Sequence, residues 1–345
     1  MNVKKKVMQV LQHASFGEPA DVLEIIELSI PEPGPSDVVI EVEAASIHAG
    51  DLKNVAGEKT MLRNVESGGD NLTVELPQVP GIEGVGRVIA TGTRATRYSV
   101  GDRVLLPWQC GSWRSHICLP EEGFMPAPTN GSAVQLALMV NAFTAYFALT
   151  DLADLQPDDW FVQNAANSNV GQILIRLARD RGIRTINVVR RVDLIDELKA
   201  IGADVVVLDG PDLPERIRAE VGDAQLMIGL DSVSGDATGR LAASLTDGAT
   251  VANMGTMSGE PCHMPMWILH YKRIALIGYY AGHNITARTI DEQGTIIAEL
   301  ARGIASGKLE AKIAGEYSLD DFRDAVRHAA LSGESRDGKV VFVFN

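Results

Sequence analysis

The sequence predicts a mixed α/β fold in two domains, and three features support this prediction. The first 130 residues consist of short strand-like runs separated by Gly, Pro and Asp, which is typical of a β-rich domain. From Ser132 onward helical and strand-like segments alternate, a pattern that predicts a parallel, doubly wound sheet. The chain ends in a strand-like run at 339–344, which we expect to rejoin the N-terminal domain.

The N-terminal domain is expected to be a partly closed β-barrel. Short apolar runs bounded by turn residues predict its strands at 7–12, 38–45, 87–90, 103–106 and 113–119. Because the last strand of the chain joins them, this domain is discontinuous. It comprises residues 1–130 and 287–345.

The second domain, residues 131–286, is expected to hold the alternating elements. Apolar residues at helical spacing predict helices at 133–150, 170–182 and 192–201. Apolar runs between them predict strands at 160–163, 184–189, 204–208, 225–230, 249–254 and 273–279. Two further helices, at 286–306 and 319–330, precede the last strand.

The stretch at 58–75 shows neither helical nor strand-like periodicity. It is polar and contains Ser67-Gly68-Gly69-Asp70-Asn71. A loop of this length inside a compact domain is either functional or mobile. The sequence therefore leaves open whether this loop covers a substrate or is a plain insertion.

The segment Q-N-A-A-N-S-N-V-G-Q, from Gln163 to Gln172, joins a strand-like run to a helix. A strand, a tight turn of small residues and a helix N-terminus bring backbone N–H groups to one point, which suits a bound phosphate. Gly171 is the only glycine in this turn, so an ordinary strand–helix corner is the alternative interpretation.

Arg190 and Arg191 follow the next predicted strand. NAD-binding proteins usually carry Asp or Glu at this place, for the ribose 2′-hydroxyl. Guanidinium groups suit a 2′-phosphate instead. A solvated pair at a strand end is the alternative, but the spacing from the turn favours an NADPH site.

Composition excludes several classes of partner. The formal net charge of −14 argues against nucleic acid or an anionic membrane and leaves a small-molecule substrate. No apolar run approaches membrane-spanning length, and the residues after Lys4-Lys5-Lys6 are too polar for a signal peptide. Cys110, Cys118 and Cys262 form no disulfide framework, which favours a cytoplasmic protein.

Several short strings resemble the medium-chain dehydrogenase/reductase superfamily over almost the whole chain. They are G-x-E-G-x-G-x-V at 81–88, G-D-R-V at 101–104 and G-K-V-V at 338–341. Four more resemble the mitochondrial and bacterial 2-enoyl thioester reductases of that superfamily: G-S-W-R at 111–114, V-N-x-x-T-A-Y at 140–146, the turn at 163–172 and I-N-V-V-R at 186–190. The resemblance implies a GroES-like β-barrel domain and a Rossmann domain.

The resemblance also implies which residues contact NADPH. Asn141 would touch the nicotinamide end, the turn would face the pyrophosphate, and Arg190 and Arg191 would face the 2′-phosphate. The other implied contacts lie in the turn, on two later loops and on the last strand: Asn167, Ser168, Asn169, Val170, Met254, Gly255, Met257, Tyr279, Tyr280, Ala281 and Lys339. The methionines and tyrosines also suit a core or an interface, and Lys339 an exposed strand.

Zinc-dependent alcohol dehydrogenases of the superfamily bind catalytic zinc through Cys and His. Two of those positions resemble His48 and Ile82 here, and isoleucine cannot coordinate zinc. We therefore expect no metal. By resemblance, the zinc-free architecture transfers a hydride from NADPH to the β-carbon of a double bond conjugated to a carbonyl, in an enoyl thioester or an enone.

The enoyl thioester reductases carry a catalytic tyrosine shortly after an aspartate that matches Asp51. This chain has G-E-K-T at 57–60 there, with no tyrosine. Lys59 and His48 are the candidates for handling the proton, although a solvated Lys59 is the plainer interpretation. Trp113 is expected to form an apolar wall of the substrate pocket, opposite the loop at 58–75.

Three functions stay open at this point: an enoyl reductase, a quinone oxidoreductase of the same architecture, and a catalytically inactive nucleotide-binding relative. We also expect a homodimer. The apolar run at 274–277 would be the last strand of the parallel sheet, and pairing two such edges around a two-fold axis would cover them.

Overall fold

The computed structural model describes residues 7–58, 75–331 and 338–344. Its backbone divides into two compact units. Unit 1 comprises Met1–Met139 and Thr289–Asn345, and unit 2 comprises Val140–Arg288. The expected boundaries at 130 and 287 differ most at the first division, because helix α3 (Ala133–Leu136) belongs to unit 1.

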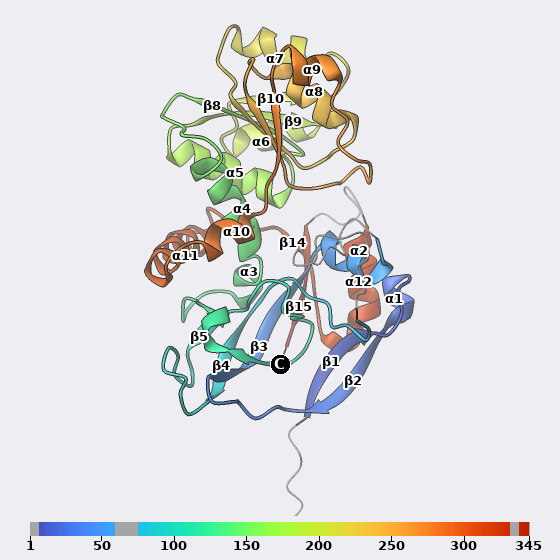
Figure 1. Cartoon of the computed structure of the whole chain (residues 1–345), viewed down its shortest axis with the longest axis vertical. Helices are drawn as coiled ribbons and strands as arrows, with labels where there is room; N and C mark the ends of the chain where they lie inside the picture. Colours follow the sequence, from blue (N-terminus) through green and yellow to red (C-terminus); the bar gives the residue numbers. More distant parts are fainter. Residues whose placement is uncertain (1–6, 59–74, 332–337, 345) are drawn as a thin grey trace, which may run out of the picture. The chain divides into compact units, whose positions relative to one another are not determined.

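Unit 1 is built on a seven-stranded sheet (Figure 1). Its order is β14-β15-β3-β4-β5-β7, and β6 also pairs with β3. The C-terminal strand β15 runs antiparallel to β3, with Val340 opposite Ile47, so the chain end rejoins the N-terminal sheet as predicted. The strands are β3 (Asp37–Ile47), β4 (Gly84–Thr91), β5 (Arg103–Leu105), β6 (His116–Pro120), β7 (Met125–Pro126), β14 (Ile313–Tyr317) and β15 (Lys339–Val343).

A separate two-stranded sheet, β1 (Val7–His13) with β2 (Leu23–Ser29), belongs to the same unit. Strand β2 was not predicted, because Ile25 and Ile26 stand side by side and break the alternation of apolar and polar residues. The helices α1, α2 and α12 lie side by side although α12 is far from the other two in sequence (Figure 1). Their bounds are α1 (Pro19–Val22), α2 (Ala49–Ala56) and α12 (Phe322–Ala330).

Unit 2 contains a six-stranded parallel sheet in the order β10-β9-β8-β11-β12-β13, which confirms the predicted doubly wound arrangement. The chain runs outward from β8 to β10, then returns to β11 on the other side of β8. Ligands of such sheets bind at the carboxyl ends of the strands where the order reverses. The strands are β8 (Trp160–Asn164), β9 (Arg184–Val189), β10 (Val205–Leu208), β11 (Ile228–Asp231), β12 (Thr250–Asn253) and β13 (Ala275–Gly278).

The helices of unit 2 alternate with these strands. Helix α5 shows why they form, because Val170, Ile173, Leu174 and Leu177 recur at helical spacing and are all buried. Helices α7 and α8 were not predicted. The helices are α4 (Met139–Thr150, beginning at the division between the units), α5 (Asn169–Asp180), α6 (Leu194–Ala200), α7 (Leu213–Val221), α8 (Asp236–Ser244), α9 (Met266–His270) and α10 (Ala281–Thr286).

The helix predicted at 286–306 begins later, as α11 (Ile290–Ala305) in unit 1. Thr289 has extended backbone angles and forms a capping box with Glu292, so a new helix starts there. Short 3-10 turns complete the unit, η1 (Glu121–Gly123) and η2 (Leu319–Asp321). Among the described residues, no helix is long and apolar enough to cross a membrane.

Candidate active site

The turn between β8 and α5 is tightly constrained. Ala165 has a positive φ of 48°, in the left-handed region. At Gly171, an added Cβ would lie 2.5 Å from the carbonyl oxygen of Ala166, so only glycine fits. Ser168 caps the helix, because its Oγ accepts a hydrogen bond from the Gly171 N–H at 3.2 Å. One glycine therefore suffices for the close approach of helix and strand.

The same turn fits a phosphate ligand. Asn169 begins α5, and its side-chain Nδ2 is buried without a hydrogen-bond partner. A buried amide donor left unpaired is costly, and a bound anion would satisfy it. Asn167 is exposed beside it, whereas Val170 is buried and packs inward. Pyrophosphate oxygens would match the unpaired donor and the helix N-terminus.

A buried side-chain network joins this turn to β9. Gln163 Nε2 donates to the Gly171 carbonyl oxygen at 3.1 Å and to Asn187 Oδ1 at 2.8 Å. Asn187 in turn donates to Thr185 Oγ1 and to the Val205 carbonyl oxygen. Sequence reasoning missed this network, although polar residues in the middle of two buried strands were a visible signal.

The two arginines predicted to bind the 2′-phosphate stand at the end of β9. Arg190 is exposed and forms no ion pair with any described residue. Arg191 is half-buried, and its Nη2 lies 3.3 Å from Asp193 Oδ2. At least one guanidinium is therefore available to an anionic ligand at this strand end.

The remaining predicted cofactor residues of unit 2 differ in exposure. Asn141 is buried on α4. Met254 and Gly255 are half-buried after β12, where Met257 is exposed. After β13, Tyr280 is exposed and Ala281 is buried.

Two predicted cofactor residues have structural partners. Tyr279 is buried, its hydroxyl donates to the Thr144 carbonyl oxygen at 2.7 Å, and burial raises its pKa. Lys339 lies in unit 1, at the start of β15 and opposite Ile313 of β14. All the other predicted cofactor residues belong to unit 2, so Lys339 is the one predicted contact that lies in unit 1.

Unit 1 contains a buried acid–base cluster around His48, which precedes α2. His48 Nε2 lies 2.6 Å from Glu83 Oε1, with 14% and 4% of their side chains exposed. Ser46 Oγ donates to the same carboxylate oxygen at 3.2 Å. Glu83 was not among the predicted site residues, because it is 35 positions away in the sequence.

Asp51 lies next to this pair. Its Oδ2 accepts a hydrogen bond from the His48 backbone N–H at 2.8 Å. Burial raises the pKa of the carboxyl from 3.8 to about 6, although the neighbouring His48 lowers it in part. The cluster thus contains three titratable groups in a region with little access to water.

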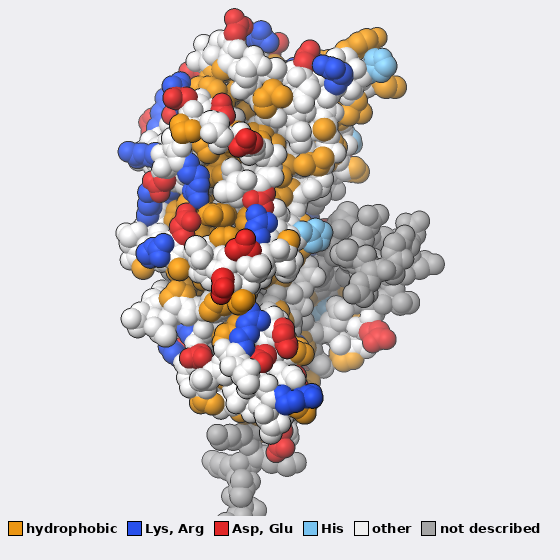
Figure 2. All heavy atoms as spheres, turned by 60° about the vertical axis from the view of Figure 1, so that its left-hand side comes forward, with side chains coloured by type: hydrophobic (Ala, Val, Ile, Leu, Met, Phe, Trp, Pro, Cys, Tyr) orange, Lys and Arg blue, Asp and Glu red, His pale blue; other side chains and the backbone are white. Residues whose placement is uncertain are grey.

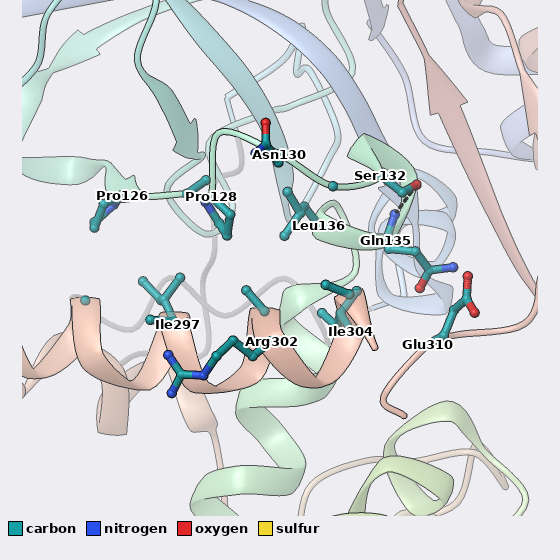
Figure 3. Close-up of a pocket in the computed structure, with 16 residues that line it drawn as sticks. Pro126, Pro128, Asn130, Ser132, Gln135, Leu136, Ile297, Arg302, Ile304 and Glu310 are labelled. Carbon is teal, nitrogen blue, oxygen red and sulfur yellow. Dashed lines mark hydrogen bonds between the residues drawn. The ribbon is translucent and has the colours of Figure 1, made fainter. Parts of the chain in front are cut away.

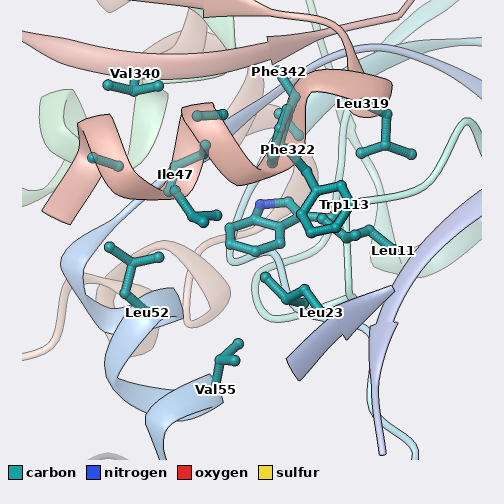
Figure 4. Packing of buried hydrophobic residues seen from close by; sticks show 14 of the residues in the cluster. Leu11, Leu23, Ile47, Leu52, Val55, Trp113, Leu319, Phe322, Val340 and Phe342 are labelled. Atoms are coloured by element: carbon teal, nitrogen blue, oxygen red, sulfur yellow. The ribbon is translucent and has the colours of Figure 1, made fainter. Parts of the chain in front are cut away.

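The prediction for Trp113 is wrong. Its side chain has no exposed surface and packs in the hydrophobic core of unit 1, among Leu23, Ile47 and Phe322 (Figure 4). The indole Nε1 donates to the Ser46 carbonyl oxygen at 3.0 Å, and Phe342 meets the ring edge-on at 5.3 Å. A large flat aromatic suits a core as well as a pocket wall, and sequence alone does not separate the two.

Lys59 and most of the loop at 58–75 lie outside the described residues. A pocket of about 680 Å³ is present elsewhere in unit 1 (Figure 3). Pro126, Pro128 and Leu136 face Ile297 and Ile304 of α11 across it. None of the predicted site residues that the structure describes lines this pocket, so it is separate from the His48 cluster and from the turn after β8.

Comparisons with known proteins give the family. The alcohol dehydrogenase GroES-like domain profile matches residues 34–145, and the zinc-binding dehydrogenase profile matches residues 169–295. Human mitochondrial enoyl-[acyl-carrier-protein] reductase is 32% identical over 92% of this chain and 84% of the human protein. The chain belongs to the medium-chain dehydrogenase/reductase family. Its Dictyostelium discoideum relative of the same name is 30% identical, over 94% of this chain and 91% of its own.

Solved structures of this medium-chain dehydrogenase/reductase family share the fold. A Bacillus thuringiensis protein described as an NADPH:quinone reductase has a TM-score of 0.87 at 25% identity, over 99% of this chain and 100% of that one. A mutant form of Candida tropicalis enoyl thioester reductase has a TM-score of 0.79 at 23% identity, over 98% and 100%. The GroES-like and Rossmann assignment is confirmed.

The donor set of this medium-chain dehydrogenase/reductase does not fit a catalytic zinc ion. His48 is engaged by Glu83, and Ile82, which precedes Glu83, has no lone pair to offer. Within the described ranges, no group of three or more His, Cys, Asp or Glu side chains is placed to hold a metal.

Proposed function

We propose that this chain is an NADPH-dependent reductase of an activated carbon–carbon double bond, in a 2-enoyl thioester or an enone. The observation that carries the proposal is the turn after β8, where an unpaired buried amide of Asn169 meets the N-terminus of α5. The human relative is named an enoyl-[acyl-carrier-protein] reductase. A neighbour with 23% identity and a TM-score of 0.80 is a complex of Etr1p with NADP and crotonyl-CoA.

The reaction needs a hydride and a proton. When bound, NADPH supplies a hydride that adds to the β-carbon of the double bond. The π electrons of that bond move toward the carbonyl, so negative charge develops on its oxygen. A proton then joins the α-carbon, which completes the saturated product. The chain must therefore hold the cofactor, accommodate the developing charge and deliver one proton.

Unit 2 supplies all but one of the cofactor contacts in this proposal. The N-terminus of α5 with Asn169 would take the pyrophosphate, and Arg190 with Arg191 the 2′-phosphate. Tyr279 would contribute its ring, since its hydroxyl already donates to Thr144. The remaining proposed contacts are Asn141, Asn167, Ser168, Val170, Met254, Gly255, Met257, Tyr280, Ala281 and Lys339 of unit 1.

His48 is the proposed proton donor that replaces the missing tyrosine. A contact of 2.6 Å lets imidazole and the Glu83 carboxylate hold one proton between them. Ser46 fixes the carboxylate by donating to the same oxygen. Histidine is the side chain most often used for proton transfer in enzymes, which suits His48 to this role. Lys59 stays the alternative donor, and the loop at 58–75 a proposed contributor to substrate selection.

A quinone oxidoreductase is the second candidate function. It is favoured by the lack of a tyrosine between Met1 and Tyr98 and by the fold shared with the mycobacterial quinone oxidoreductase, which has 25% identity and a TM-score of 0.81. Absorbance of NADPH at 340 nm would be followed with crotonyl-CoA and, separately, with a small quinone. We expect faster turnover with crotonyl-CoA or an enone, unaffected by prolonged treatment with a chelator. Turnover of the quinone alone would contradict the leading proposal.

We also propose a homodimer that forms through the edge strand β13. Leu276 and Ile277 of this strand are 38% and 41% exposed, and among the described strands β13 pairs with β12 alone. Met266, Trp267 and Tyr271, on and next to α9, are exposed as well. An apolar edge is an aggregation hazard unless it is covered. One solved neighbour is the Etr1p/Etr2p heterodimer of Candida tropicalis, so a mixed pair is the alternative. A monomeric mass by light scattering would contradict the proposal.

The surface agrees with a small-molecule substrate. Acidic and basic side chains are interspersed on the face shown in Figure 2, with no large area of one sign there. The net charge of −14 disfavours polyanions. The three cysteines are free thiols, and we propose a reducing compartment for the chain. The matched relatives are named mitochondrial proteins, so a mitochondrial location is as compatible with free thiols as the cytoplasmic one we expected.

A further inference from the structure

Asp231, the last residue of β11, is fully buried and accepts five hydrogen bonds. Asn164 Nδ2 donates to its Oδ1 at 2.6 Å, as do the backbone N–H groups of Val233 and Ser234 at 2.9 and 3.1 Å. Thr238 Oγ1 and Asn253 Nδ2 donate to its Oδ2 at 2.5 and 3.1 Å. None of these donors is a cation, so neutral dipoles alone stabilise a buried carboxylate.

The carboxylate ties together three neighbouring strands at their carboxyl ends. Asn164 ends β8 and Asn253 ends β12, on either side of β11. Asn164 also accepts a hydrogen bond from the Ser232 N–H at 2.8 Å, so it bonds both to Asp231 and to the residue after it. This is the place where the strand order reverses, at which doubly wound sheets bind their ligands.

The network continues into the loop after β12. Asn253 Nδ2 also donates to the Gly255 carbonyl oxygen at 3.0 Å, and Ser234 Oγ donates to the same oxygen at 2.7 Å. Ser234 has a positive φ of 65°, an unfavourable conformation for a non-glycine residue. The Asp231 bond to its N–H helps to hold it there.

We infer that Asp231 is a positioning residue for NADPH binding. It acts by holding the loop Met254–Met257 in place through Asn253 and Ser234. The inference rests on the proposed function. Asparagine cannot replace it, because one of its two terminal atoms would be an NH₂ group facing the donors Thr238 and Asn253. Two of the five donors, the N–H groups of Val233 and Ser234, lie in the loop after β11, and Asn253 leads into the loop after β12.

The test compares four proteins by titration with NADPH and by steady-state kinetics. Asp231→Asn is expected to raise the Kd of NADPH at least tenfold and to change the KM of the enoyl substrate less than twofold. Thr238→Val removes one donor and keeps the carboxylate, so a smaller rise in Kd of about threefold is expected. Asp209→Asn is the matched control. It breaks the bidentate ion pair with Arg240, at 2.6 and 2.8 Å, without contacting the loop.

Hydrogen exchange supplies a local measurement. In the parent protein, NADPH is expected to protect amides 253–258 from exchange, and this protection should be lost in Asp231→Asn but kept in Asp209→Asn. If Asp231→Asn does not fold, the Kd of NADPH measured for Thr238→Val decides whether the inference holds. Variants that lose thermal stability but bind NADPH within twofold of the parent would overturn the inference and leave the proposed function intact. A parent that does not bind NADPH would overturn both.

Discussion

The nucleotide turn of unit 2 and the His48 cluster of unit 1 are built in different ways. In the turn, the residues from Gln163 to Gln172 are contiguous, and their roles follow from a strand, a cap and a helix. In the cluster, Ser46 and His48 meet the distant Glu83 only through the fold of the sheet. The first site is therefore determined by local geometry, and the second by tertiary contacts. Substitutions should distinguish the two regions. Those in unit 1 are expected to change stability or proton delivery, and those at the nucleotide turn to change NADPH binding.

The largest expected effect concerns stability in unit 1. Trp113→Ala should lower the free energy of unfolding by about 3–5 kcal/mol, because it empties the centre of a packed core. Chemical denaturation measures the change. Phe16→Ala, at an exposed aromatic residue of unit 1, is the control and should have a much smaller effect. An unchanged stability with an altered substrate preference would return Trp113 to the pocket wall that we first expected.

The next effect is the pH dependence contributed by Asp51. Its pKa of about 6 in the folded state exceeds the ordinary value of 3.8 for this carboxyl, so the folded protein binds the proton more tightly. This contribution to stability is complete below about pH 4 and is lost as pH rises through about 6, a loss of about 3 kcal/mol. Asp51→Asn should remove this loss, whereas Asp158→Asn, at an exposed carboxylate, should not. Parallel stability curves from pH 4 to 7 for Asp51→Asn and the parent would contradict the assignment.

The third effect concerns the proton. His48→Gln should lower kcat about 100-fold, or about 2.7 kcal/mol in the barrier, and leave the Kd of NADPH within twofold. Glu83→Gln should shift the pH profile of kcat, since it removes the negative charge beside the imidazole. His13→Gln, which alters another buried histidine of unit 1, is the control. Normal turnover in His48→Gln would direct attention to Lys59.

The smallest effect concerns cofactor choice in unit 2. Arg190→Ala should raise the KM of NADPH about tenfold and hardly change that of NADH, because only NADPH carries a 2′-phosphate. Arg184→Ala lies at the opposite end of the same strand and should change neither value. Equal losses with both cofactors would mean that Arg190 supports the fold rather than the phosphate.

The same difference explains what the sequence could predict. Six parallel strands, the turn and the return of β15 were foreseeable, because apolar periodicity and small turn residues are local signals. Glu83, Asp231 and the Gln163–Asn187 pair were missed, since their partners are distant in sequence. Trp113 was misplaced because its type suits a core and a pocket equally. Helices α7 and α8 carry proline, glycine and small residues, which weakened their periodic signal.

The central proposal, transfer of a hydride from NADPH to a conjugated double bond, is tested most directly with isotopes. The purified chain would be incubated with crotonyl-CoA and NADPH deuterated at C4 of the nicotinamide, and the product analysed by mass spectrometry and NMR. We predict butyryl-CoA with deuterium on the β-carbon, and deuterium on the α-carbon when unlabelled NADPH is used in D₂O. Oxidation of NADPH with crotonyl-CoA recovered unchanged, while a quinone in the same mixture is reduced, would contradict the proposal.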